Sequence, residues 1–167
     1  MLLTTHAVIG AGIASLFPKQ PALGVILAFL SHYALDTIPH WNYALRSRKY
    51  DAENELHGEI LINKDFLRDL IKIGVDFALG LILAFYIFKE PNVKNNLLPL
   101  LGALAGTFPD ALQFAYYKIR REPFLSFQKV HIFFHSKDLR LDRRPWPLGL
   151  ALQATLIVAA VIFLKII

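Results

Sequence analysis

Histidines and aspartates occur inside hydrophobic segments of this chain, where few ionisable side chains are expected. These residues are His6, His32, Asp36, His40, Asp76 and Asp110, with His131 and His135 shortly afterwards. Ionisable groups at membrane depth are costly and are usually retained for function. Neutral imidazoles combined with carboxylates are a typical ligand set for a divalent metal ion. If these side chains converge in space, they form a metal site inside a membrane protein.

One apolar segment carries three of these residues at close spacing. His32 and Asp36 are four positions apart, so both side chains project from the same face of a helix. Pro39 ends that helix and lets His40 fold back towards the same ion. A structural hydrogen bond between His32 and Asp36 uses the same spacing, so the pattern leaves that alternative open.

The remaining candidates within apolar segments differ in their local surroundings. Asp76 lies four residues after Lys72, and an ion pair between the two is the alternative to metal ligation. Asp110 follows a proline that bends its helix and frees carbonyl groups, and no cation lies on the same turns. His6 precedes the small-residue run 7–12, which permits close helix packing, although an interfacial histidine would look the same.

Composition indicates a single membrane domain covering residues 1–167. The chain is 55% hydrophobic and has a mean hydropathy of +0.43, which is too apolar for an ordinary soluble domain. It has no cysteine, which excludes disulfides, thiolate metal ligands and cysteine nucleophiles. Any metal must therefore be held by nitrogen and oxygen. No basic region precedes the first apolar segment, so we expect a retained helix rather than a signal peptide.

The hydropathy pattern predicts an all-α integral membrane bundle of about five transmembrane helices. The apolar segments are 2–17, 22–38, 67–88, 97–117 and 147–167. The third and fourth are long enough to cross about 30 Å of hydrocarbon, whereas the first is short enough to be tilted, re-entrant or partly inserted. An interfacial amphipathic helix is expected at 124–139, with His131 and His135 on its aromatic face. An ordinary interfacial anchor with incidental histidines is the alternative.

Basic residues indicate the orientation of this bundle. With five spans, the loops at about 39–66 and 118–146 share one side, and with the adjoining helix turns they hold fourteen of the 18 lysines and arginines. This bias places the N-terminus in the cytoplasm and the C-terminus outside. All eight histidine and aspartate candidates then fall in or beside the cytoplasmic leaflet, which favours one common site.

Three short motifs carry a resemblance to a known family. They are Thr5-His6 before a small-residue helix, His32-x-x-x-Asp36-x-x-Pro39-His40, and Gly106-x-x-Pro109-Asp110. At these residues the chain resembles the membrane-bound metal-dependent hydrolases of bacteria and archaea, which are small multi-helix proteins distantly similar to zinc-dependent phospholipase C. The resemblance implies a bacterial or archaeal plasma membrane and phosphoester hydrolysis. The chain lacks the Arg-Gly-x-Thr-His-Ser segment of the better-known family pattern.

These features together predict a metal-dependent hydrolase of a phospholipid or lipid-linked phosphate. One or two divalent ions are expected, with Zn²⁺ first and Mn²⁺ or Fe²⁺ next. The predicted metal ligands are His6, His32, Asp36, His40, Asp76, Asp110 and His135. His131 is the predicted general acid or base. The arginines predicted to hold phosphate are Arg120, Arg121, Arg140, Arg143 and Arg144.

Two other functions are compatible with the same residues. In one, the metal is structural and the basic loop recruits a partner or anionic lipid. In the other, the protein transports a metal, but the outer halves of the helices, such as 81–85 and 97–104, are nearly all apolar and offer no polar path. We expect no nucleic acid partner, because basic residues beside membrane helices are common and no nucleic-acid motif is present. No feature of the sequence indicates an oligomeric state.

Overall fold

The computed structural model describes residues 1–49, 51, 54–90, 97–135 and 146–167, and within them the fold is all-helical. The six α-helices among these residues are α1 (Leu3–Ser15), α2 (Pro21–Asp36), α3 (Lys64–Phe88), α4 (Leu97–Ile119), α5 (Phe124–Phe134) and α6 (Trp146–Ile166). A short antiparallel hairpin of β1 (Arg48–Lys49) and β2 (Glu59–Ile60) encloses the 3-10 turn η1 (Glu55–His57).

The helices follow the predicted segments, with local signals at their ends. Pro21 occupies the first turn of α2, where a missing backbone N–H costs nothing. Asn63 caps α3 by accepting a hydrogen bond from the backbone N–H of Phe66 at 3.0 Å. The amphipathic segment forms α5, although the helix ends at Phe134.

Three of the described helices, α3, α4 and α6, are long and apolar enough to cross a membrane. α1 and α2 are apolar but have 13 and 16 residues. At about 1.5 Å per residue they extend only ~20 and ~24 Å, less than the hydrocarbon thickness. The described structure therefore supports three membrane-spanning helices. It does not confirm the five spans that the hydropathy pattern predicts.

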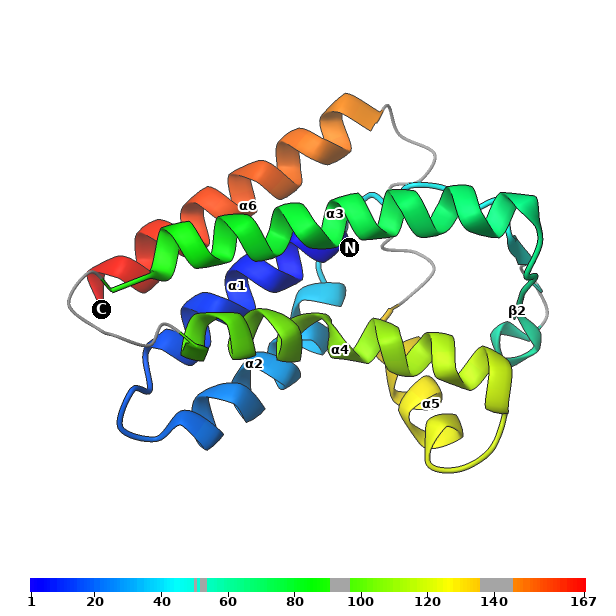
Figure 1. Cartoon of the computed structure of the whole chain (residues 1–167), viewed down its shortest axis with the longest axis horizontal. Helices are drawn as coiled ribbons and strands as arrows, with labels where there is room; N and C mark the ends of the chain where they lie inside the picture. The colour runs from blue at the N-terminus through cyan, green and yellow to red at the C-terminus, as the bar shows by residue number, and fades with distance from the viewer. Residues whose placement is uncertain (50, 52–53, 91–96, 136–145) are drawn as a thin grey trace.

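α1 lies at the centre of the bundle and contacts α2, α3, α4 and α6 (Figure 1). Its side chains are buried on nearly every face, and Ala7, Val8 and Ala11 form a core with Ala84 and Phe88 of α3. α3 and α4 extend past α1 to the other end of the molecule, where the β-hairpin and α5 lie (Figure 1). The N-terminus of α1 and the C-terminus of α2 meet between these two parts (Figure 1).

Glycines let the backbones of α1 and α4 touch. A Cβ atom added to Gly106 would lie 2.5 Å from the carbonyl oxygen of His6, and one added to Gly10 would lie 2.5 Å from that of Gly102. Small residues at a helix crossing allow this close approach. The contact places His6 beside the turn of α4 that precedes Asp110, so the helix crossing positions the candidate ligands.

We expect Gly106→Ala to destabilise the protein by about 1–3 kcal/mol, because the new methyl group must push two backbones apart. Gly74→Ala is the matched control, since a Cβ atom there meets nothing within 4 Å. That variant should be unchanged or more stable by about 0.5–1 kcal/mol. Unfolding of detergent-solubilised protein, followed by circular dichroism, measures both effects. Equal stability of the two variants would contradict the close crossing.

Candidate metal centre

α2 and the loop after it bring three predicted ligands together. His32 and Asp36 lie one turn apart, and His32 Nε2 is 3.1 Å from Asp36 Oδ2. The helix ends at Asp36, and the chain turns so that His40 Nε2 lies 3.8 Å from Asp36 Oδ1. The structure thus places His40 at the same carboxylate as its spacing predicted.

Two further histidines reach Asp36 from distant parts of the chain. His6 Nε2 of α1 lies 3.3 Å from Asp36 Oδ1, and the His6 ring stacks on His32 with 3.9 Å between ring centroids. His131 Nε2 of α5 lies 3.4 Å from Asp36 Oδ2. The side chains of His6 and His32 are fully buried, and that of Asp36 is 1% exposed. Four imidazole nitrogens therefore surround one carboxylate that is almost completely removed from solvent.

Asp110 and His135 complete the cluster at its edge. Asp110 Oδ1 lies 3.8 Å from His32 Nε2 and 3.9 Å from His131 Nε2. His135 Nε2 lies 3.3 Å from His40 Nε2. The Asp110 side chain is 33% exposed, in contrast to the buried Asp36. Asp110 is therefore the more accessible of the two carboxylates.

The hydrogen bonds of two histidines orient their lone pairs into the cluster. His32 Nδ1 lies 2.8 Å from the carbonyl oxygen of Gly106, and His40 Nδ1 lies 2.7 Å from that of Ile38. A carbonyl only accepts, so each Nδ1 must carry the proton and donate it. In the neutral ring, each Nε2 then presents a lone pair towards Asp36. Backbone carbonyls commonly orient metal-binding histidines in this way.

A lone pair that faces a carboxylate oxygen needs a proton or a cation between them. His32 Nε2 is buried without a hydrogen-bond partner, as are both ring nitrogens of His6. Protonating both of these stacked, buried rings would place two positive charges 3.9 Å apart between centroids in a region that solvates charge poorly. A divalent cation among the nitrogens satisfies the lone pairs and the carboxylates together.

The ligand atoms form three overlapping groups, each with all its atoms within 4.8 Å of one another. The groups are His6 with His32 and Asp36, His32 with Asp110 and His131, and Asp36 with His40 and His135. Asp36 directs Oδ2 towards His32 and His131 and Oδ1 towards His6 and His40. Such a carboxylate can bridge two cations, so the arrangement can hold one or two ions.

Asp76 lies outside these three groups and contacts α1 instead. Its carboxylate accepts hydrogen bonds from the backbone N–H groups of Leu3 at 2.8 Å and Thr4 at 3.0 Å, and from the Thr4 hydroxyl at 2.6 Å. The Tyr43 hydroxyl donates to it at 3.3 Å. Burial, followed by the Asp76 charge, raises the pKa of Tyr43, which keeps this phenol a donor. The carboxylate thereby caps the N-terminus of α1 and fixes the turn that carries His6.

The alternative ion pair of Lys72 with Asp76 is not the contact observed. Lys72 Nζ lies 3.3 Å from Asp69 Oδ1, and Asp69 also accepts from the backbone and hydroxyl of Ser47. Sequence reasoning missed Asp69, although it lies three residues before Lys72 on the same helix. It also missed the N-terminal ammonium of Met1, which lies 3.2 Å from Asp36 Oδ1.

Only two of the predicted phosphate-binding arginines lie in the described part of the chain. Arg120 donates from its two terminal nitrogens to the carbonyl oxygens of Leu56 and Gly58, so it clamps the η1 turn to the end of α4. Arg121 is exposed in the turn that follows. The other three, Arg140, Arg143 and Arg144, lie outside the described residues.

No protein-family model, curated protein or solved structure matches this chain. The resemblance to membrane-bound metal-dependent hydrolases stays a prediction that rests on its motifs.

The two carboxylates Asp36 and Asp76 should respond differently to the same substitution. Asp36→Asn should lower the number of transition-metal ions bound per chain, because an amide cannot neutralise or bridge the cluster. Asp76→Asn should retain the metal and lose about 1–2 kcal/mol of stability, because the cap of α1 is weakened. Elemental analysis and thermal unfolding of the purified variants measure the two effects. Loss of metal from Asp76→Asn with retention in Asp36→Asn would contradict this assignment.

Proposed function

We propose that this protein is a membrane-embedded metal-dependent hydrolase that cleaves a phosphoester of a phospholipid or lipid-linked substrate. The observation that carries the proposal is the convergence of four histidine Nε2 atoms on the buried carboxylate of Asp36. Bringing ionisable side chains from four separate segments into a buried site costs free energy, and such sites are usually functional. The Asp110 side chain is 33% exposed, so a substrate could reach this carboxylate from solvent.

The donor atoms favour a borderline transition metal. Imidazole nitrogen combined with carboxylate oxygen suits Zn²⁺, Mn²⁺ or Fe²⁺, whereas Mg²⁺ and Ca²⁺ prefer oxygen alone. We place Zn²⁺ first, held by His32, Asp110 and His131, with a second ion at Asp36, His40 and His135. His131 is close to both carboxylates, so we count it among the ligands rather than as a separate acid or base.

A bound ion of this type lowers the pKa of a water molecule and polarises a phosphoryl oxygen, which is the chemistry that phosphoester hydrolysis needs. The residues around the cluster hold the ligand side chains in position and keep water away from its buried side. The carbonyl oxygens of Gly106 and Ile38 hold two rings in place. The stacked His6 and His32 rings close the buried side. The substrate phosphate therefore approaches from the side of Asp110.

A lipid substrate agrees with the position of the cluster among helices that are suited to a membrane. The described chain has three helices suited to a membrane, and α3 and α6 expose large apolar side chains such as Ile82, Tyr86, Ile162 and Phe163. We propose that α1 and α2 also enter the membrane as a hairpin, with the N-terminus and the cluster at the cytoplasmic leaflet. The phosphate of a cytoplasmic-leaflet lipid would then lie at the depth of the cluster.

Purified protein loaded with Zn²⁺ should release phosphate or a phosphorylated head group from one member of a panel of phospholipids and lipid-linked phosphates. Chelation should remove the activity, and Asp110→Asn should lower it by about 100-fold or more, since it removes a ligand at the accessible side. Asp65→Asn, on the exposed start of α3, is the control that should keep full activity. Protein that retains Zn²⁺ and hydrolyses nothing in the panel would instead favour a structural metal.

The proposed orientation has a direct chemical test, because the chain has no cysteine to react in the background. A membrane-impermeant maleimide added to intact cells should label Lys19→Cys, in the turn between α1 and α2. Lys64→Cys, at the start of α3, should react only after permeabilisation. The opposite pattern would reverse the orientation, and labelling of neither residue in intact cells would show that the α1–α2 turn does not reach the outer surface.

A further inference from the structure

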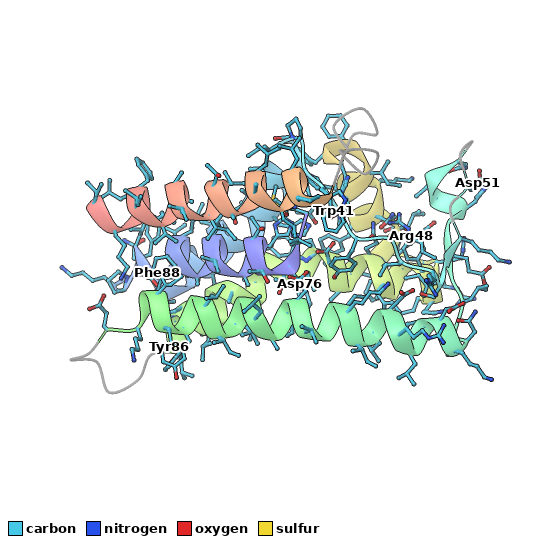
Figure 2. The ribbon with its side chains drawn as sticks, turned by 90° about the horizontal axis from the view of Figure 1, so that it is seen from above. Trp41, Arg48, Asp51, Asp76, Tyr86 and Phe88 are labelled. Carbon is cyan, nitrogen blue, oxygen red and sulfur yellow. The ribbon has the colours of Figure 1, made fainter. Side chains whose placement is uncertain are left out.

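A half-buried arginine, Arg48, lies at the end of the molecule opposite the α1–α2 turn and forms no ion pair with any acidic side chain that the structure describes. Arg48 belongs to β1, which pairs with β2 so that Arg48 lies opposite Ile60. Its guanidinium donates to the Tyr117 hydroxyl at 2.9 Å and lies over the Tyr117 ring, 5.6 Å from the centroid. Figure 2 shows Arg48 towards the end that carries the β-hairpin, and Asp76 nearer the middle of α3.

Other basic side chains of the same region have clear partners: Lys118 and Arg120 of α4 donate to backbone carbonyl oxygens, and two basic residues of α3 pair with carboxylates. Arg68 pairs with Asp65, and Lys72 pairs with Asp69. Among the described residues, no carboxylate lies within ion-pair distance of Arg48, and its buried Nε–H has no hydrogen-bond partner. Buried donors without a partner are uncommon in proteins, and a bound water or anion is one way in which such a group is satisfied. The planar guanidinium is suited to an oxyanion such as a phosphate group, which it can bind with paired hydrogen bonds.

Arg48 lies on the same side of α4 as the metal centre. Its partner Tyr117 is seven residues after Asp110, two turns further on the same face, or about 10 Å along the helix. Phe124 and Leu125 of α5 pack near Tyr117, while His131 of α5 reaches Asp110. α5 therefore runs back along α4 from the tyrosine to the metal centre.

A second buried group without a partner lies between these two points. Gln128 of α5 is 1% exposed and its Oε1 accepts no hydrogen bond. It precedes His131 by three residues, so both side chains occupy one face of α5. Along α4 from the candidate ligand Asp110, the structure therefore has first an acceptor without a partner, Gln128 Oε1, and then a donor without a partner, Arg48 Nε.

We propose that Arg48 binds a second phosphate on the polar head group of the substrate, and that Gln128 accepts a hydrogen bond from a hydroxyl group between the two phosphates. This inference rests on the proposed function and narrows its substrate class. The substrate is a lipid phosphodiester whose head group ends in a phosphate monoester. The metal centre holds the scissile phosphate, and Arg48 selects the terminal one.

Binding of non-hydrolysable probes tests this inference without turnover. Propane-1,3-bisphosphonate and hexane-1,6-bisphosphonate carry two phosphonates, and propylphosphonate and hexylphosphonate carry one. Calorimetry with full-length, Zn²⁺-loaded protein in detergent should give at least one bisphosphonate a Kd about tenfold lower than its monophosphonate. Arg48→Gln should remove this preference and leave the monophosphonate Kd unchanged. Arg68→Gln, at an exposed arginine on α3, should keep it.

Arg48→Lys provides a second variant that preserves the positive charge if the glutamine variant does not fold. It should reduce the preference several-fold without abolishing it, because an ammonium cannot form the paired hydrogen bonds of a guanidinium. Equal affinity of the wild-type protein for mono- and bisphosphonates, or a preference that survives Arg48→Gln, would overturn the inference. A preference that depends on Arg48 in a protein that hydrolyses no lipid would support the anion site and refute the proposed hydrolase.

Discussion

A carboxylate that is almost wholly removed from solvent must be neutralised by its neighbours, and Asp36 imposes this requirement on the whole bundle. Its two oxygens are approached by His6, His32, His40 and His131, which come from α1, α2, the loop after α2 and α5. The N-terminal ammonium of Met1 also donates to Oδ1 at 3.2 Å. Desolvation makes an uncompensated charge in this position very costly. The tertiary contacts of these four segments are therefore coupled through one side chain, and a cation at the cluster would stabilise all of them together.

The central position of α1 follows from this constraint. His6 can reach Asp36 only if α1 lies close to both α2 and α4, and the glycines at its crossing with α4 remove the side chains that would keep the backbones apart. Asp76 then fixes the first turn of α1 from the side of α3. Packing and hydrogen bonding between protein groups thus hold the histidine in place, which is the preorganisation expected of a functional site.

Carboxylates in apolar helices serve two different purposes in this protein. Asp36 and Asp110 face imidazole lone pairs and have the surroundings of metal ligands. Asp76 faces backbone N–H groups and a hydroxyl, so its charge is compensated by a helix N-terminus. The same residue type in an apolar helix is therefore suited to bind a metal ion or to cap a helix, depending on whether acceptors or donors surround it.

The sequence by itself determined the helical elements and most of the cluster. Long apolar runs, bounded by proline, asparagine and polar loops, specified the helices, and the i, i+4 spacing of His32 and Asp36 placed both on one face. Local rules of this kind depend on neighbours in the chain, so they can be read without a structure. They also predicted that His131 and His135 share one face of a helix at 124–139; in the structure α5 ends at Phe134 and His135 follows it directly.

Only the tertiary structure decided how these elements meet. The close crossing of α1 and α4, the role of Asp76 as a cap, the membership of His131 in a ligand group and the partner of Arg48 all depend on contacts between residues far apart in sequence. Spacing along one helix carries no information about which other helix faces it. The chain thus specifies its candidate ligands locally, whereas the assignment of each to a metal, a helix end or a substrate depends on packing.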